Sequence, residues 1–291
     1  MIKRTKGERV FNVFNIALML ILSVVFLLPY LMVITASFTD NTKLLVNGYS
    51  LFIPKFSMEA YSLLFSGRLG ILRAILNSLI VTAGKTVLAV LVNAMFAYPL
   101  SKEFFPGKRF FNVLALVTMY ISGGAVAVYL NMKSLGLYNS LWVLILPGVA
   151  GAWYTLLIKS YYMTIPKSLI EAASIDNANE MQILFLVVLP LSKPILATVA
   201  LFAAVSSWSN WVEATLWISA SRTDLYPLAT VIKLLIDNFT NPTGSSTGVS
   251  DLPETQMMNA AVVVSSLPII MIYPFVQKYF ISGMTIGAVK E

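Results

Sequence analysis

The chain has 291 residues, of which 58% are hydrophobic and 11% are charged. A soluble domain carries about 25% charged residues, so the composition excludes a water-soluble globular protein and predicts an integral membrane protein. Cysteine and histidine are absent from the sequence, which excludes disulfides, thiol nucleophiles, imidazole bases and most zinc or haem sites. We therefore expect neither an enzyme nor a metal or cofactor bound to this chain.

Six apolar segments are each long enough, at roughly 20 residues, to cross a bilayer as a helix. Their expected ranges are 13–38, 74–100, 110–130, 140–163, 191–218 and 258–281. The first run is too long for the apolar part of a signal peptide, so we expect it to stay uncleaved. The sequence thus predicts an all-α membrane protein with six transmembrane helices.

The positions of the basic residues predict which side of the membrane each loop faces. Lys and Arg gather on the cytoplasmic side of membrane proteins. With the N-terminus inside, twelve of them face the cytoplasm and seven face outward, which favours cytoplasmic N- and C-termini. Three loops are long, at 39–73 and 219–256 outside and 164–190 inside, and residues 228–239 of the last outer loop predict an amphipathic helix.

The inner loop at 164–190 is a polar segment in an otherwise apolar chain. Its spacing predicts two short helices, with Pro166 in the first turn of the first. Asn177 is expected to end that helix because Asn tolerates left-handed backbone geometry. The second helix is expected to start near Ala178 and to be interrupted by Pro190. Periodicity alone leaves open an amphipathic helix pair lying at the lipid interface.

The same loop contains a spaced motif whose residues are Glu171, Ala172, Ala173, Asp176, Asn177, Leu189 and Pro190. The motif resembles the EAA loop of ABC transporter permease subunits, which reads EAA, three residues, Gly, nine residues and Ile-x-Leu-Pro. Asn177 stands at the Gly position and Val187 at the Ile position. The resemblance implies a coupling helix that docks on a separate ATPase subunit, with Glu171 offering a carboxylate to a partner arginine.

The C-terminus resembles the tail of the maltose-type sugar permease subunits, G-x-T-x-G-G-V-K-G. The matching residues are Gly283, Thr285, Gly287, Val289 and Lys290. In that family the tail contacts the ATPase subunits, whereas a solvated terminus is the simpler interpretation. The resemblance covers nearly the whole chain and extends to the branch of carbohydrate-uptake permeases that handles complex oligosaccharides.

The resemblance implies a type I ABC importer permease in a bacterial plasma membrane. The implied divisions are a first helix with its outer loop at 1–70, a permease core at 71–281 and a cytoplasmic tail at 282–291. The implied partners are a second, non-identical permease subunit, an ATPase dimer, an extracytoplasmic solute-binding protein and a carbohydrate. ATP and Mg²⁺ are expected on the partner ATPase, since Gly84-Lys85-Thr86 lacks the Gly that a phosphate-binding loop requires in place of Leu79.

Polar and aromatic side chains inside the predicted spans suggest a substrate path. Charged groups there are costly and usually face a cavity or a partner, and aromatic rings beside amides and carboxylates suit a sugar. The candidates are Asn77, Asn93, Ser122, Trp208, Asn210, Trp211 and Glu213. Trp also gathers at membrane interfaces without binding anything, and Lys85 in the second span is able to snorkel or to pair with another subunit.

Two other function classes stay open. An ion-coupled secondary transporter would use Lys85 and Glu213 as an intramembrane charge pair, but such folds usually show paired repeats and broken helices at the midplane, which the sequence does not predict. A non-transporting membrane scaffold would account for the exposed loops but not for the EAA spacing.

Overall fold

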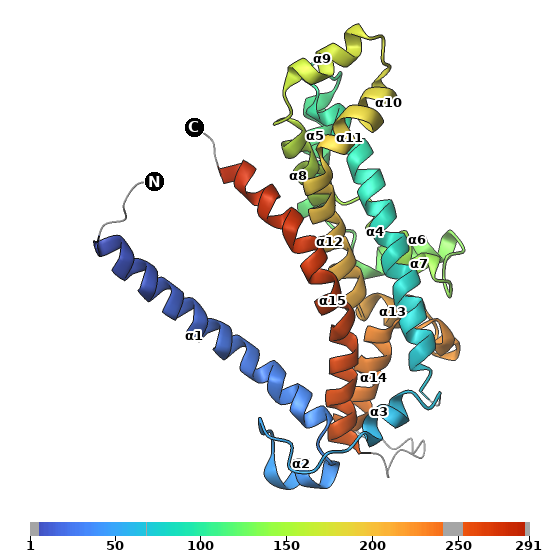
Figure 1. Ribbon diagram of the computed structural model, residues 1–291. Coiled ribbons are helices and arrows are strands. Elements are labelled where there is room, and N and C mark those ends of the chain that lie inside the picture. The colour runs from blue at the N-terminus through green and yellow to red at the C-terminus, as the bar shows by residue number, and fades with distance from the viewer. Residues whose placement is uncertain (1–5, 68, 241–252, 289–291) are drawn as a thin grey trace. The chain divides into compact units, whose positions relative to one another are not determined.

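The structure is a computed structural model that describes residues 6–67, 69–240 and 253–288. Every regular element in these ranges is a helix, and the one strand-like feature there is an isolated antiparallel bridge between Thr39 and Phe56. The predicted all-α class is therefore confirmed for the described part of the chain (Figure 1).

The described residues belong to two compact units. These comprise residues 1–69 with 234–267, and residues 70–233 with 268–291. Two helices, α14 (Leu228–Thr240) and α15 (Glu254–Ala288), contribute residues to both units. α14 is the helix predicted at 228–239, and its buried residues Leu228 and Ile232 lie on one face at the expected spacing.

The first unit is built on α1 (Lys6–Ser37), which has Pro29 in its interior. Its apolar part, Phe11–Ser37, is long enough to cross a membrane, and none of its most apolar window is buried within the chain. Such a surface suits lipid tails. Two short helices, α2 (Asn41–Asn47) and α3 (Glu59–Leu64), follow α1.

Gln256 joins the start of α15 to the loops of the first unit. Its side chain is fully buried, and Nε2 donates to the carbonyls of Ser37 at 3.2 Å and Ser57 at 3.0 Å. Further along the same helix, the hydroxyls of Tyr30 and Ser266 lie 2.6 Å apart. A buried amide without hydrogen bonds is costly, so these contacts fix the register of α15 against the end of α1.

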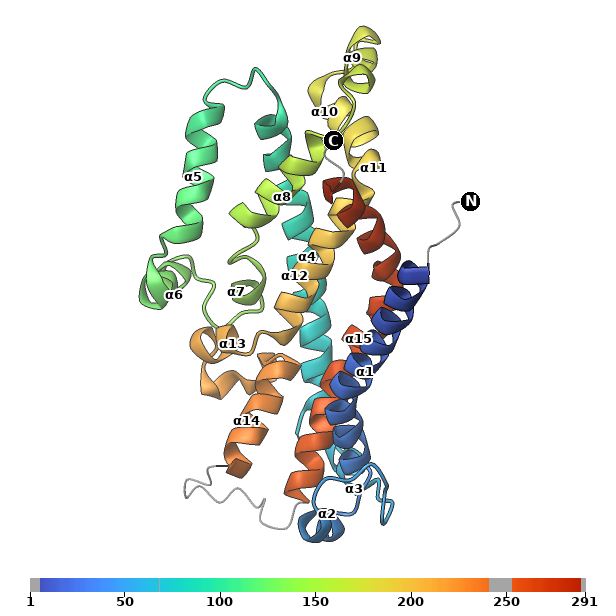
Figure 2. The same cartoon turned by 90° about the vertical axis from the view of Figure 1, so that its left-hand side faces the viewer.

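α4 (Ile71–Ser101) is the central helix of the second unit (Figure 2). Its 31 residues give it a length of about 46 Å, enough to cross a membrane. It packs against α8 (Ala152–Tyr162) and α12 (Lys193–Ser209). Ala97 and Ile158 are completely buried in the cluster that these helices share, since a small side chain on α4 allows close helix approach.

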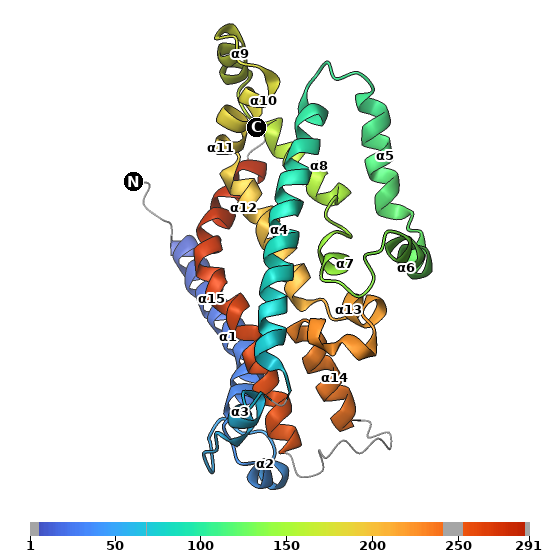
Figure 3. The ribbon, with the colours of Figure 1, turned by 90° about the vertical axis from the view of Figure 1, so that its right-hand side faces the viewer.

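Short elements lie toward the two ends of α4 (Figure 3). α9 (Lys167–Ile175) and α10 (Glu180–Gln182) lie near its C-terminal end, whereas α13 (Val212–Trp217) and the 3-10 helix η2 (Ala220–Leu225) lie toward its N-terminal half. The second unit therefore places the EAA loop and the predicted last outer loop at opposite ends of one long helix.

Three predicted spans are single helices, with 13–38, 74–100 and 258–281 falling in α1, α4 and α15. The span predicted at 110–130 is wrong as a continuous helix, because α5 (Lys108–Tyr120) and α6 (Gly124–Ser134) are bent by 111°. Gly124 has a φ of 77°, a conformation that glycine adopts at little cost. The run Ser-Gly-Gly at 122–124 is the local cause of the break.

The spans predicted at 140–163 and 191–218 are also interrupted. In the former, α7 (Trp142–Ile145) and α8 are separated by a turn in which Gly148 has a φ of 74°; in the latter, α12 ends before the extended residue Asn210. Three described helices are long and apolar enough to cross a membrane, or five if each of two bent pairs is one span. The expectation of unbroken helices is therefore wrong for these segments.

Candidate functional site

The EAA loop, residues 164–190, begins with the predicted helix. α9 spans Lys167–Ile175 directly after Pro166, and Asn177 has a left-handed φ of 57°. The N–H groups of Asn177 and Ala178 donate to carbonyls of the last helical turn, which is the hydrogen-bond pattern of a Schellman cap. The prediction that Asn177 ends this helix is confirmed.

The second half of the loop contains a π-helix, which is wider than the α-helix expected from the sequence. α10 (Glu180–Gln182) follows a capping box at Asn179, and a π-helix over Ile183–Val188 continues it. Pro190 is the second residue of α11 (Leu189–Leu191), which follows the π-helix, and proline is tolerated in the first turn of a helix. The chain bends by 80° at Ser192, so the interruption predicted at Pro190 is wrong by two residues.

The motif residues of the EAA loop lie on two short helices. Those on α9 and its cap are Glu171, Ala172, Ala173, Asp176 and Asn177, and those on α11 (Leu189–Leu191) are Leu189 and Pro190. Glu171 and Ala172 are exposed, whereas Leu189 is half-buried against the core beneath the loop. Ile175, the last residue of α9, has 80% of its surface exposed. The exposed part of α9 thus presents a carboxylate, a small side chain and an apolar side chain to a partner.

A cavity of about 850 Å³ lies between the EAA loop and the C-terminal end of α4. Glu171 and Ile170 line it from α9, Met95 and Lys102 from the α4 side, and Glu180 from α10. Side chains of both charges therefore meet at one end of the second unit.

The predicted tail contact falls partly on described residues. Gly283, Thr285 and Gly287 belong to α15, so the described part of the tail is helical. Val289 and Lys290 lie outside the described residues.

An ion pair joins two broken parts of the second unit. Lys85 Nζ on α4 lies 3.1 Å from Glu213 Oε2 on α13, and the side chains are 14% and 25% exposed. Asn210, at the break before α13, accepts a hydrogen bond from the Glu213 N–H at 3.2 Å. Lys233 Nζ lies 5.2 Å from the centre of the Trp211 ring, a cation–π distance. The break that the sequence did not predict therefore places Glu213 opposite Lys85.

Asn93 uses its whole amide inside the core. Its Nδ2 donates to the carbonyls of Ala89 at 2.6 Å and Val149 at 2.7 Å, and its Oδ1 accepts from Gly151 N–H at 3.0 Å and Thr155 Oγ1 at 2.8 Å. An amide has two donors and two acceptor positions, so this side chain is saturated. In this conformation Asn93 ties the turn between α7 and α8 to α4 and offers no group to a solute.

Two further candidates from the sequence lie outside α4 and α13, the helices that carry the Lys85–Glu213 pair. Ser122 is exposed at the break between α5 and α6, where its Oγ accepts from Gly124 N–H at 3.2 Å. Trp208 is 7% exposed near the end of α12. The structure thus gathers Asn210, Trp211 and Glu213 and leaves Ser122 elsewhere.

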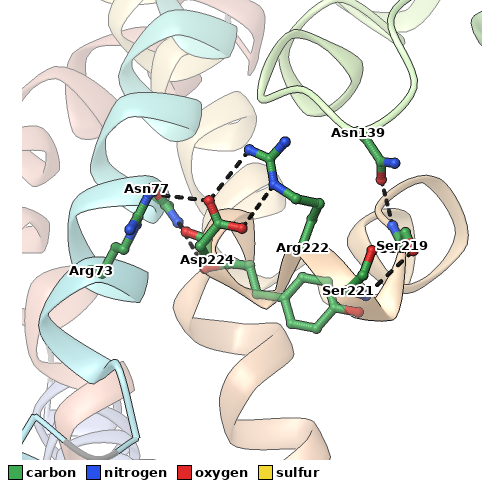
Figure 4. Close-up of polar contacts among 8 residues, drawn as sticks. Arg73, Asn77, Asn139, Ser219, Ser221, Arg222 and Asp224 are labelled. Carbon is green, nitrogen blue, oxygen red and sulfur yellow. Dashed lines mark hydrogen bonds and ion pairs between the residues drawn. The ribbon is translucent and has the colours of Figure 1, made fainter.

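A second polar cluster lies at the N-terminal end of α4 (Figure 4). The buried Asn77 donates through Nδ2 to the carbonyls of Asp224 at 2.9 Å and Tyr226 at 3.2 Å. The carboxylate of Asp224 accepts from Arg73 Nη2 at 3.1 Å and Arg222 Nε at 3.0 Å. The Arg222 contact holds the pKa of Asp224 below its ordinary value. Two guanidinium groups thus surround one carboxylate, leaving one net positive charge.

Sequence reasoning named Asn77 in this cluster and missed its charged members. Arg73 and Asp224 are 151 positions apart, so no local spacing links them. The available signal was the run Ser-Arg-Thr-Asp at 221–224, whose two charges interrupt an apolar region. Asn139, with a left-handed φ of 59°, accepts from Ser219 N–H at 2.6 Å and holds the start of this run (Figure 4).

The family described as binding-protein-dependent transport system inner membrane component matches residues 4–286 of this chain. The chain belongs to this family. Protein LplC of Bacillus subtilis (strain 168) is 35% identical over 98% of this chain and 97% of its own length. The polygalacturonan/rhamnogalacturonan transport system permease protein YtcP of the same organism is 33% identical, over 97% of this chain and 99% of its own.

This chain also resembles a chain of a solved transporter along almost the full length of both. A chain in the crystal structure of a bacterial ABC transporter involved in the import of the acidic polysaccharide alginate matches with a TM-score of 0.83 and 28% identity, over 96% of this chain and 100% of that one. The fold is therefore that of an ABC importer permease, and this permease is a multi-pass protein of the bacterial plasma membrane.

Proposed function

We propose that this permease is one half of a heterodimeric pore in an ATP-driven importer of oligosaccharides. The observation that carries the proposal is the EAA loop, whose capped helix α9 exposes Glu171 and Ala172 within a family of transport permeases. ATP and Mg²⁺ bind the partner ATPase subunits, and a solute-binding protein outside the membrane delivers the sugar. Oligosaccharide transport is supported by the similarity to YtcP and to the arabinooligosaccharides transport system permease protein AraQ of Bacillus subtilis (strain 168), which is 30% identical over 96% of this chain.

The proposed mechanism uses the stiffness of the EAA loop. Closure of the ATPase dimer pushes α9, and capped short helices pass on a rigid-body movement that a flexible loop would absorb. Glu171 pairs with a basic residue of the ATPase, and the tail residues of α15 form a second contact with it. The movement reorients the pore between its two openings.

We further propose that the chain crosses the membrane six times with both termini in the cytoplasm. The bent pair α5–α6 and the interrupted segments at 140–163 and 191–218 supply the three spans that are not single helices. The excess of Lys and Arg on the EAA-loop side supports this orientation.

We also propose that the sugar carries uronic acid groups. At the end of α4 remote from the EAA loop, Arg73 and Arg222 exceed Asp224 by one positive charge, and the Lys85 charge is matched by Glu213. Similar proteins include the permease YtcP of a polygalacturonan/rhamnogalacturonan transport system and a transporter involved in the import of the acidic polysaccharide alginate. Arg222→Gln should lower uptake of an oligogalacturonate more than uptake of a neutral oligosaccharide of equal length, and equal loss for both would contradict an anionic substrate.

The test of the proposed function is charge reversal on α9. Glu171→Lys should leave the protein inserted but abolish sugar-dependent stimulation of the ATPase in the reconstituted importer. Glu59→Lys, at an exposed position on α3, is the matched control and should behave as wild type. Normal transport by the Glu171→Lys variant would contradict the proposal.

Two observations favour an ion-coupled mechanism, the Lys85–Glu213 pair and the breaks within the predicted spans. Depleting ATP while the proton and sodium gradients are held constant separates the two mechanisms. Uptake should stop if ATP drives transport and should continue if an ion gradient does.

A further inference from the structure

One carboxylate of the EAA loop binds two side chains of the α4 end. Tyr98 Oη donates to Glu180 Oε2 at 2.5 Å, and Lys102 Nζ lies 2.8 Å from the same oxygen and 3.2 Å from Oε1. Lys102 Nζ also lies 4.9 Å from the centre of the Tyr98 ring. Tyr98 lies in the last turn of α4 and Lys102 is the residue that follows its C-terminus, so both reach Glu180 from the same end of the helix.

Both sides of this contact are held firmly. The capping box of Asn179 and Gln182 fixes the backbone on either side of Glu180. Tyr98 is 7% exposed and belongs to the buried cluster that contains Ile183 and other residues of the π-helix. A displacement of α10 therefore acts on α4 through a residue with a capped backbone and a tyrosine whose ring is packed in the core.

The contact of Glu180 with Tyr98 and Lys102 lies beside a cavity and near a second ion pair. A cavity of about 850 Å³ lies between α9 and the end of α4, beside the buried apolar cluster that joins the π-helix to α4. A second ion pair, Lys167 to Glu103, lies at the same end with side chains 68% and 61% exposed. Exposed pairs of this kind contribute little. In the Lys102–Glu180 pair the side chains are 29% and 69% exposed, so what distinguishes this pair is that Glu180 also accepts the hydroxyl of the buried Tyr98.

We propose that Tyr98 and Lys102 are positioning residues that hold Glu180 and thereby transmit movement of the EAA loop to α4. The proposal rests on the proposed function, since it needs an ATPase to move α9. α4 leads from this contact to the Lys85–Glu213 pair and on to Asn77, which holds the opposite end. One helix thus links the EAA loop to the segments around the predicted substrate path.

The test compares charge reversal with charge exchange in the complete importer reconstituted with its ATPase and binding protein. Lys102→Glu and Glu180→Lys should each lower the sugar transported per ATP hydrolysed by at least about five-fold, the lower end of typical coupling between sites. The double variant should recover to within about two-fold of wild type, because the pair is restored with opposite polarity and a tyrosine oxygen is able to accept from the new lysine. Glu59→Lys, at an exposed position on α3 and outside the EAA loop, is the charge-reversal control and should keep the wild-type ratio.

Conservative variants make the test independent of folding defects. Tyr98→Phe keeps the buried ring and Glu180→Gln keeps the side-chain shape, so both should insert and co-purify with the ATPase while the transport-to-ATP ratio falls. Single variants with a wild-type ratio, or an inserted double variant no better than the singles, would overturn the proposal. Absence of ATP-driven uptake by the wild-type importer would instead overturn the proposed function.

Discussion

The Lys85–Glu213 pair allows a quantitative prediction for the broken helix. At the observed 3.1 Å separation, Coulomb attraction is about 5 kcal/mol at an effective dielectric constant near 20 and about 1 kcal/mol in water. Desolvation offsets part of the larger figure. The side chains are 14% and 25% exposed, so removing one partner leaves a partly buried charge uncompensated. We therefore expect an interaction free energy of about 2–3 kcal/mol between Lys85 and Glu213.

A double-mutant cycle measures this interaction. Lys85→Met and Glu213→Gln should each lower the free energy of unfolding in mixed micelles by about 2–3 kcal/mol, whereas the double variant should lose about as much as one single variant. Lys167→Met, which removes one partner of the exposed pair with Glu103, is the control and should lose less than about 1 kcal/mol. If the losses of the two single variants add fully in the double variant, Lys85 and Glu213 do not interact and the position assigned to α13 is wrong.

Three further outcomes follow from individual contacts. Asn177→Gly should match wild type in thermal melting, whereas Asn177→Val should lower the unfolding free energy by about 1–2 kcal/mol because φ is positive there. Asn93→Leu should lower it by about 2–4 kcal/mol in the same assay, since several buried partners lose their hydrogen bonds. Because the pKa of Asp224 is lowered, its contribution to stability is complete above its ordinary pKa of 3.8 and is lost as pH falls through the lowered value. Protection of the η2 amides from hydrogen exchange, corrected for intrinsic exchange rates, should therefore be constant between about pH 5 and 8. A loss of protection within that range would contradict the assigned Arg222 contact.

The long helices and the EAA helix could be predicted because their signals are local. An uninterrupted apolar run predicts α1 and α4, and the left-handed tolerance of Asn predicts the end of α9 at Asn177. The breaks at Gly124 and Gly148 were missed because apolar composition continues across them. Glycine permits a turn without requiring one, so composition alone does not decide whether a helix continues.

The contacts within the candidate site depend on distant parts of the chain. Asn93 stabilises the turn after α7 by accepting from Gly151, 58 positions away, and Lys85 meets Glu213 across 128 positions. Sequence reasoning recognised these residues as unusual inside apolar segments, since polar groups there need partners. The identity of each partner depends on helix packing and on the breaks, and so required the structure.

Docking of α9 on an ATPase subunit is the central step of the proposed mechanism. A photo-crosslinking residue in place of Ile175, which is 80% exposed on that helix, should form a covalent adduct in native membranes, and mass spectrometry then identifies the partner. We expect an adduct with an ATP-binding cassette subunit, and loss of that adduct in the Glu171→Lys variant. Adducts with lipid alone would contradict the docking role and would favour a helix pair lying at the membrane interface.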